Sequence, residues 1–96
     1  MDRAQALTLL QSHLPTLTRE FGVKSLALFG SMARDQASDG SDVDILVTLD
    51  GPATSARYFG LQFYLEDLLG RSVDLVTDKA LRSELRPYVE SDAVHV

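Results

Sequence analysis

The sequence contains no cysteine, and it has no long uninterrupted apolar run. Without cysteine the chain can form no disulfide and perform no thiol chemistry. The lack of a long apolar run argues against a transmembrane helix, and no basic and apolar leader stands at the N-terminus. At 96 residues the chain has room for one modest core. These absences predict a single cytoplasmic domain over residues 1–96 that does not associate with a membrane.

Basic residues are also scarce, with nine Lys and Arg against 14 Asp and Glu and a formal net charge of −5. Most non-specific affinity for nucleic acid comes from Lys and Arg side chains that neutralise phosphates. No basic stripe or arm is visible in this chain. We therefore expect no direct contact with nucleic acid, whereas an acidic surface suits a basic protein partner.

The most informative pattern is a glycine-serine step followed by a pair of aspartates. A strand-like run over residues 24–29 ends at Gly30 and Ser31, and ten residues later Asp42 and Asp44 open a second apolar run. Alternate side chains on a strand share a face, so Asp42 and Asp44 are expected to project together, about 6.5 to 7 Å apart at Cα. Two carboxylates at that separation can hold two metal ions for an in-line displacement at phosphorus. Gly-Ser and Ser-Asp steps also occur in ordinary turns, which is the alternative reading.

The connection between the two runs predicts how they pair. It is too short for a parallel crossover, so the second strand is expected to return antiparallel to the first. Gly30 and Ser31 would then lie beside Asp42 and Asp44. Residues 32–37 are compatible with a helix, whose first N–H groups could bind a phosphate close to Gly30. Arg34 on that helix could reach a triphosphate or remain a solvated charge.

A third carboxylate, Asp74, lies inside another short strand pattern over residues 71–77. A charge within an apolar run is costly unless it is paired or bound to metal. About one helix separates this strand from the previous one, which predicts a β-α-β unit with parallel strands. Parallel register would bring Asp74 to the same edge of the sheet as Asp42 and Asp44.

The remaining segments predict helices. Apolar residues recur at helical spacing over residues 4–14, and Pro15 is expected to kink this helix or open a second one that ends near Gly22. Residues 59–69 predict an amphipathic helix, with Phe59 and Phe63 at core spacing, that ends at Gly70. Thr77 or Asp78 could cap a last helix that Pro87 interrupts.

Gly30-Ser31-x10-Asp42-x-Asp44 together with Asp74 resembles the signature of the DNA polymerase β-like nucleotidyltransferase superfamily. Four segments of the sequence are similar to the minimal branch of this superfamily, the MNT-type proteins. They are residues 23–34, 68–76, 85–89 and 93–96. This resemblance implies an α/β or α+β fold, with a small mixed β-sheet flanked by helices as in the polymerase β palm. Asp35 departs from the pattern, because such proteins often have glycine after the arginine.

The resemblance also implies an activity and a partner. MNT-type proteins of this size are typically antitoxins paired with a HEPN-domain RNase toxin, and some transfer AMP from ATP to a toxin tyrosine. The chain would then be a protein adenylyltransferase with two Mg²⁺ ions, using ATP, within a homo-oligomer or a hetero-oligomer with the toxin. The implied catalytic and metal-binding residues are Asp42, Asp44 and Asp74, and the implied phosphate-binding residues are Gly30, Ser31 and Arg34.

Two other functions stay open. The domain could transfer a nucleotide to a small molecule, as aminoglycoside nucleotidyltransferases do, with a dimer completing the pocket. Alternatively, the site is idle and the chain neutralises a toxin by binding alone. Exposed apolar surface in the C-terminal segment would be a structural sign of that second function.

Overall fold

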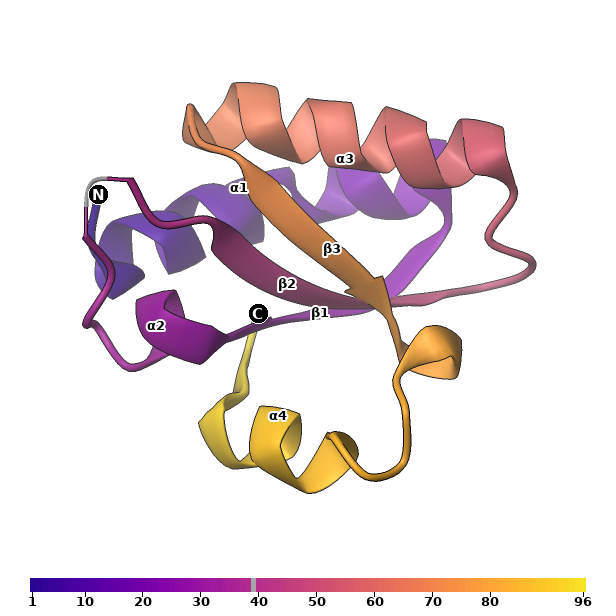
Figure 1. The fold of residues 1–96 in the computed structure, drawn as a ribbon. Helices are drawn as coiled ribbons and strands as arrows, with labels where there is room; N and C mark the ends of the chain where they lie inside the picture. The colour runs from indigo at the N-terminus through magenta and orange to yellow at the C-terminus, as the bar shows by residue number, and fades with distance from the viewer. Residues whose placement is uncertain (39) are drawn as a thin grey trace.

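The fold is that of a computed structural model, which describes residues 1–38 and 40–96. A four-stranded sheet lies at its centre, in the order β3 (Val73–Thr77), β2 (Val43–Leu49), β1 (Val23–Phe29) and β4 (Val94–His95). Two long helices cover one face of the sheet, and a short helix near the C-terminus lies on the other side (Figure 1). This mixed sheet flanked by helices confirms the fold class that the sequence predicted.

The first three strands pair as the connection lengths predicted, and a fourth strand that the sequence did not predict is also present. β1 and β2 are antiparallel, β2 and β3 are parallel, and β4 adds antiparallel to the free side of β1.

The helical elements follow the sequence signals, with three differences. They are α1 (Arg3–Phe21), α2 (Gly30–Ala33), α3 (Ser55–Leu69), the 3₁₀ turn η1 (Asp78–Ala80) and α4 (Arg86–Asp92). α1 continues through Pro15, which lies on its exposed side, where water can reach the carbonyl that loses its partner. The predicted helix over 32–37 is wrong beyond Ala33, because Asp35 adopts a left-handed conformation with φ of 58°. Pro87 stands in the first turn of α4, where proline is tolerated, and does not interrupt a helix.

The core lies between the sheet and the pair α1 and α3. Alternate residues of β2 from Val43 to Val47 are buried there, and α3 contributes three leucines at four-residue spacing, Leu61, Leu65 and Leu69. Phe59 and Phe63, expected in this core, are instead 51% and 62% exposed, because the leucine row and not the phenylalanine row faces the sheet. Among the described residues, no helix has the length and apolar character needed to cross a bilayer.

Candidate functional site

The sheet register brings two of the predicted carboxylates side by side. Asp44 is the direct partner of Asp74 on β3 and of Phe29 on β1. The neighbours of Asp44 in sequence, Val43 and Ile45, are buried beneath α1 and α3, so Asp44 faces the opposite side of the sheet. We call this side, which carries Asp44, the open face.

Asp42 directly precedes β2 and is exposed, while Asp44 is partly buried. Burial, followed by the negative charges of Asp74 and Asp42, raises the pKa of Asp44 to about 6. The nearby positive charge of Arg34 acts in the opposite direction and lowers this pKa. The three aspartates therefore form one electrostatic group at one end of the open face.

Gly30 closes the site from the β1 side, in a left-handed conformation with φ of 69°. A Cβ atom at this position would lie 2.1 Å from Oδ2 of Asp44, far inside van der Waals contact. The backbone at the end of β1 therefore approaches the Asp44 carboxylate more closely than any residue with a side chain would allow. Both the backbone angle and the space require glycine here.

Ser31 and Arg34 follow Gly30 on and just after the single turn of α2. Ser31 is partly buried, and Arg34 is the residue at which the turn ends. The Arg34 guanidinium donates to Asp92 at the end of α4, and its Nε donates to Oε1 of Gln36 (3.2 Å). Arg34 thus lies close enough to act on Asp44, while it forms a salt bridge that links α2 to α4.

Asp35, the departure from the family pattern, is held away from the carboxylates. Its Oδ1 accepts a hydrogen bond from the backbone N–H of Arg3 (3.1 Å), at the start of α1. The Arg3 side chain in turn donates from Nη1 to the carbonyl of Ala33 (3.1 Å). The left-handed conformation of Asp35 is one that favours glycine and that aspartate tolerates better than most residues.

Sequence reasoning missed Arg71, which fixes the segment before Asp42. Nη2 of Arg71 donates to the carbonyls of Ser38 and Ser41, the latter at 3.1 Å. The backbone N–H of Ser38 also donates to Oγ of Ser41 (3.1 Å), so these two serines are bonded to each other as well as to Arg71. No signal in the sequence separates Arg71 from an ordinary surface arginine next to a turn. Asp92, the partner of Arg34, was missed for the same reason.

The three aspartates suit a hard divalent cation, because carboxylate oxygens are the ligands that Mg²⁺ prefers. A cation between these side chains would also relieve the repulsion that raises the pKa of Asp44. As arranged in the described part of the chain, however, no three His, Cys, Asp or Glu side chains are close enough together to hold a metal ion. The aspartates thus fit magnesium by the type and charge of their oxygens, whereas binding would require their side chains to move closer together.

Two comparisons with known sequences both match nucleotidyltransferases. The sequence model of the nucleotidyltransferase domain family matches residues 10–95. Protein adenylyltransferase MntA of Thermococcus cleftensis is 38% identical over 89 residues, which cover 93% of this chain and 90% of that protein.

Comparison with solved structures shows the same fold. A protein provisionally described as a minimal nucleotidyltransferase has 33% sequence identity and a TM-score of 0.84, covering 98% of this chain and 95% of the other. The MNT antitoxin complex with tri-AMPylated Shewanella oneidensis HEPN toxin gives a TM-score of 0.61 at 22% identity, covering 97% and 66% of the two chains.

Proposed function

Because the chain belongs to the nucleotidyltransferase domain family, we propose that it transfers AMP from ATP to a hydroxyl group of a HEPN-domain RNase toxin and thereby acts as an antitoxin. The observation that carries this proposal is the placement of Asp44 between Gly30 and Asp74 on the open face. A toxin tyrosine is the proposed acceptor, and the cytoplasm, which supplies ATP, is the proposed location. The name of the T. cleftensis relative and the fold shared with the S. oneidensis antitoxin support this assignment.

The three aspartates supply the proposed metal site. Asp42, Asp44 and Asp74 would together hold two Mg²⁺ ions. Bound magnesium would neutralise the triphosphate and the carboxylates, and would polarise the α-phosphate. Asp44, with its raised pKa, must be ionised for this role, so binding is expected to weaken as the pH falls through about 6.

The remaining residues orient the phosphates and the acceptor. The backbone N–H groups at Gly30 and Ser31, with the Ser31 hydroxyl, would donate to the β- and γ-phosphates. Arg34 would compensate their charge once it leaves Asp92. The acceptor oxygen forms a bond to the α-phosphorus, the bond from that phosphorus to the pyrophosphate oxygen breaks, and Asp74 accepts the proton of the acceptor hydroxyl.

Transfer of the α-phosphate label of ATP to a candidate HEPN toxin in the presence of magnesium tests this proposal. Asp44→Asn should abolish labelling, since it removes a carboxylate that binds metal without changing the size of the side chain. Asp67→Asn is the matched control, because Asp67 is exposed on α3, on the other side of the sheet. Labelling that persists in Asp44→Asn would refute the assigned site.

A second candidate function is neutralisation of the toxin by binding alone. It is favoured by exposed apolar side chains in the C-terminal segment, where Leu85 is 50% and Tyr88 is 75% exposed. If this function is correct, Asp44→Asn will still suppress the RNase activity of the toxin while the toxin stays unlabelled. Loss of suppression together with loss of label would instead favour the enzyme.

A further inference from the structure

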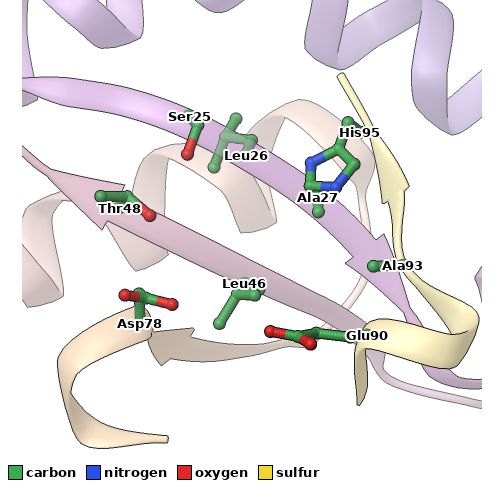
Figure 2. Close-up of a pocket in the computed structure, with 9 residues that line it drawn as sticks. All are labelled: Ser25, Leu26, Ala27, Leu46, Thr48, Asp78, Glu90, Ala93 and His95. Atoms are coloured by element: carbon green, nitrogen blue, oxygen red, sulfur yellow. The ribbon is translucent and has the colours of Figure 1, made fainter. Parts of the chain in front are cut away.

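A cavity of about 350 Å³ lies on the open face, between the sheet and the segment that carries α4. Figure 2 shows its residues, with Leu46 and Thr48 on β2, Ser25 and Ala27 on β1, and Glu90 at the edge formed by α4. Asp78, Ala93 and His95 complete the lining. The proposed reaction assigns no role to this cavity.

The sheet register places the cavity next to the carboxylates. Asp44, Leu46 and Thr48 alternate along one face of β2, so the cavity begins one pleat, about 7 Å, beyond Asp44. Ala27 is the β1 partner of Leu46, and it extends the cavity floor across to β1. Gly30 lies at the opposite end of β1 from Ser25, so Asp44 lies between the cavity and the backbone proposed to bind phosphate.

This order matches the order of parts in a nucleoside triphosphate. If the β- and γ-phosphates lie at Gly30 and Ser31, the α-phosphate lies at Asp44. The ribose is bonded to the α-phosphate through its 5′ oxygen, so the nucleoside must occupy space directly beside the carboxylates. The cavity offers that space on the side away from Gly30.

The lining indicates which part of the donor it accepts. Two carboxylates, from Asp78 and Glu90, line the cavity, and a single cation, Arg86, is shared between them, so the excess of negative charge disfavours a phosphate. Leu46 and Ala27 offer an apolar floor for a planar ring, and the hydroxyls of Ser25 and Thr48 can pair with polar edges.

The two carboxylates differ in how strongly Arg86 engages them. Nη1 of Arg86 donates to Asp78 at 2.9 Å and to Glu90 at 3.4 Å. Glu90 therefore keeps more of its capacity to accept a hydrogen bond from a ligand. An exocyclic amine on the base is the donor that such a carboxylate would select.

We propose that this cavity binds the nucleoside of the donor nucleotide, with the base on Leu46 and Ala27 and its exocyclic amine donating to Glu90. The assignment rests on the proposed function, since it takes the triphosphate to lie at Gly30 and Ser31. It gives the fold a means to prefer ATP over a nucleotide that has a carbonyl in place of the amine.

Titration calorimetry with magnesium and two ligands, ATP and inorganic tripolyphosphate, tests the cavity separately from the phosphate site. Ser25→Phe places a ring in the cavity from an exposed strand position, and Ser12→Phe makes the same change on the exposed side of α1. Ser25→Phe should weaken the binding of ATP at least about tenfold and leave the affinity for tripolyphosphate within about twofold of wild type. Ser12→Phe should change neither affinity.

A comparison of two nucleotides on the wild-type protein, followed by a substitution at an exposed residue, tests the same cavity without a risk to folding. Inosine triphosphate has a carbonyl where ATP has its amine, so wild-type protein should bind ATP about five- to tenfold more tightly, as expected for one hydrogen bond to an exposed carboxylate. Glu90→Ala, on the exposed side of α4, should bring the two affinities together. Its affinity for tripolyphosphate should stay unchanged.

The outcomes separate the two proposals. Wild-type affinity of Ser25→Phe for ATP, or equal affinity of the wild-type protein for the two nucleoside triphosphates, would overturn the cavity assignment and leave the proposed function standing. Normal ATP binding by Ser25→Phe with loss of toxin labelling would give the cavity to the acceptor, which also overturns the assignment. If wild-type protein binds neither ATP nor tripolyphosphate, the proposed function fails, and this inference fails with it.

Discussion

Asp44→Asn should stabilise the free protein at neutral pH while it removes activity. An acid whose pKa is raised in the folded chain binds more protons when folded than when unfolded. Its ionisation therefore destabilises the fold as the pH rises through the interval from the ordinary value of 3.8 to about 6. Asparagine has the same shape without the charge, so it escapes this cost.

The magnitude follows from the same pKa. The difference between 3.8 and about 6 corresponds to about 3 kcal/mol. Because the carboxylate is only partly buried, solvent screening reduces the expected gain to about 1 to 2 kcal/mol. For a domain of this size, such a gain raises the Tm by about 5 to 10 °C.

Urea denaturation of the wild-type protein and of Asp44→Asn, from pH 4 to pH 8 without magnesium, measures the difference directly. The variant should be more stable at pH 7.5, and its advantage should shrink to a small fraction of that value by pH 4, where Asp44 is protonated in the folded state and partly protonated in the unfolded state. Asp67→Asn should show no such pH-dependent difference. A variant that is equally or less stable at pH 7.5, or a difference independent of pH, would refute the electrostatic reasoning.

Magnesium and ATP should reverse the order of stability. A ligand at one hundred times its Kd adds about 2.7 kcal/mol to the stability of the protein that binds it. The wild-type protein should gain this amount, and Asp44→Asn should gain little. The same substitution would then stabilise the free protein and abolish stabilisation by ligand, which a general packing effect would not do.

Three further predictions concern residues around the carboxylates. Gly30→Ala should cost about 1 to 3 kcal/mol in urea denaturation, because its backbone is left-handed and its Cβ would collide with Asp44; a neutral result would contradict the close approach. Arg71→Ala should raise the magnesium concentration needed for half-maximal labelling about tenfold or more, by releasing the turn before Asp42, and an unchanged requirement would show that this turn holds itself. Asp35→Gly should keep the labelling rate within about twofold and change stability by less than about 1 kcal/mol, because relief of the left-handed backbone offsets the lost hydrogen bond; a large rate change would place Asp35 in the phosphate site.

The strand pairing was predictable because it depends on local rules. A connection too short for a crossover forced β1 and β2 to be antiparallel, and a helix-length connection made β2 and β3 parallel. Those two pairings alone bring Asp44 beside Asp74. The glycine pattern likewise predicted where α1 and α3 end, at Gly22 and Gly70.

Contacts between segments far apart in the chain were not predictable. The pairing of Arg34 with Asp92 joins α2 to the far end of the sequence, and Arg71 reaches back to the turn before Asp42. Neither Asp92 nor Arg71 belongs to a periodic pattern in the sequence, and each contact depends on the direction of the side chain after the sheet has formed. The exposure of Phe63 was missed for a related reason, since α3 carries apolar residues on more than one side and only tertiary packing selects the buried row.

The parallel pairing of β2 with β3 also has a consequence for the order of folding. Gly30 and Asp44 meet within an antiparallel pair of neighbouring strands, which closes a short loop and can form early. Asp74 joins them only after α3 has crossed over the sheet and docked, a contact of much higher sequence separation with a larger entropic cost of closure. We therefore expect the three aspartates to come together late in folding. A partly folded chain would then carry Gly30 beside Asp44 while Asp74 is still absent from the site.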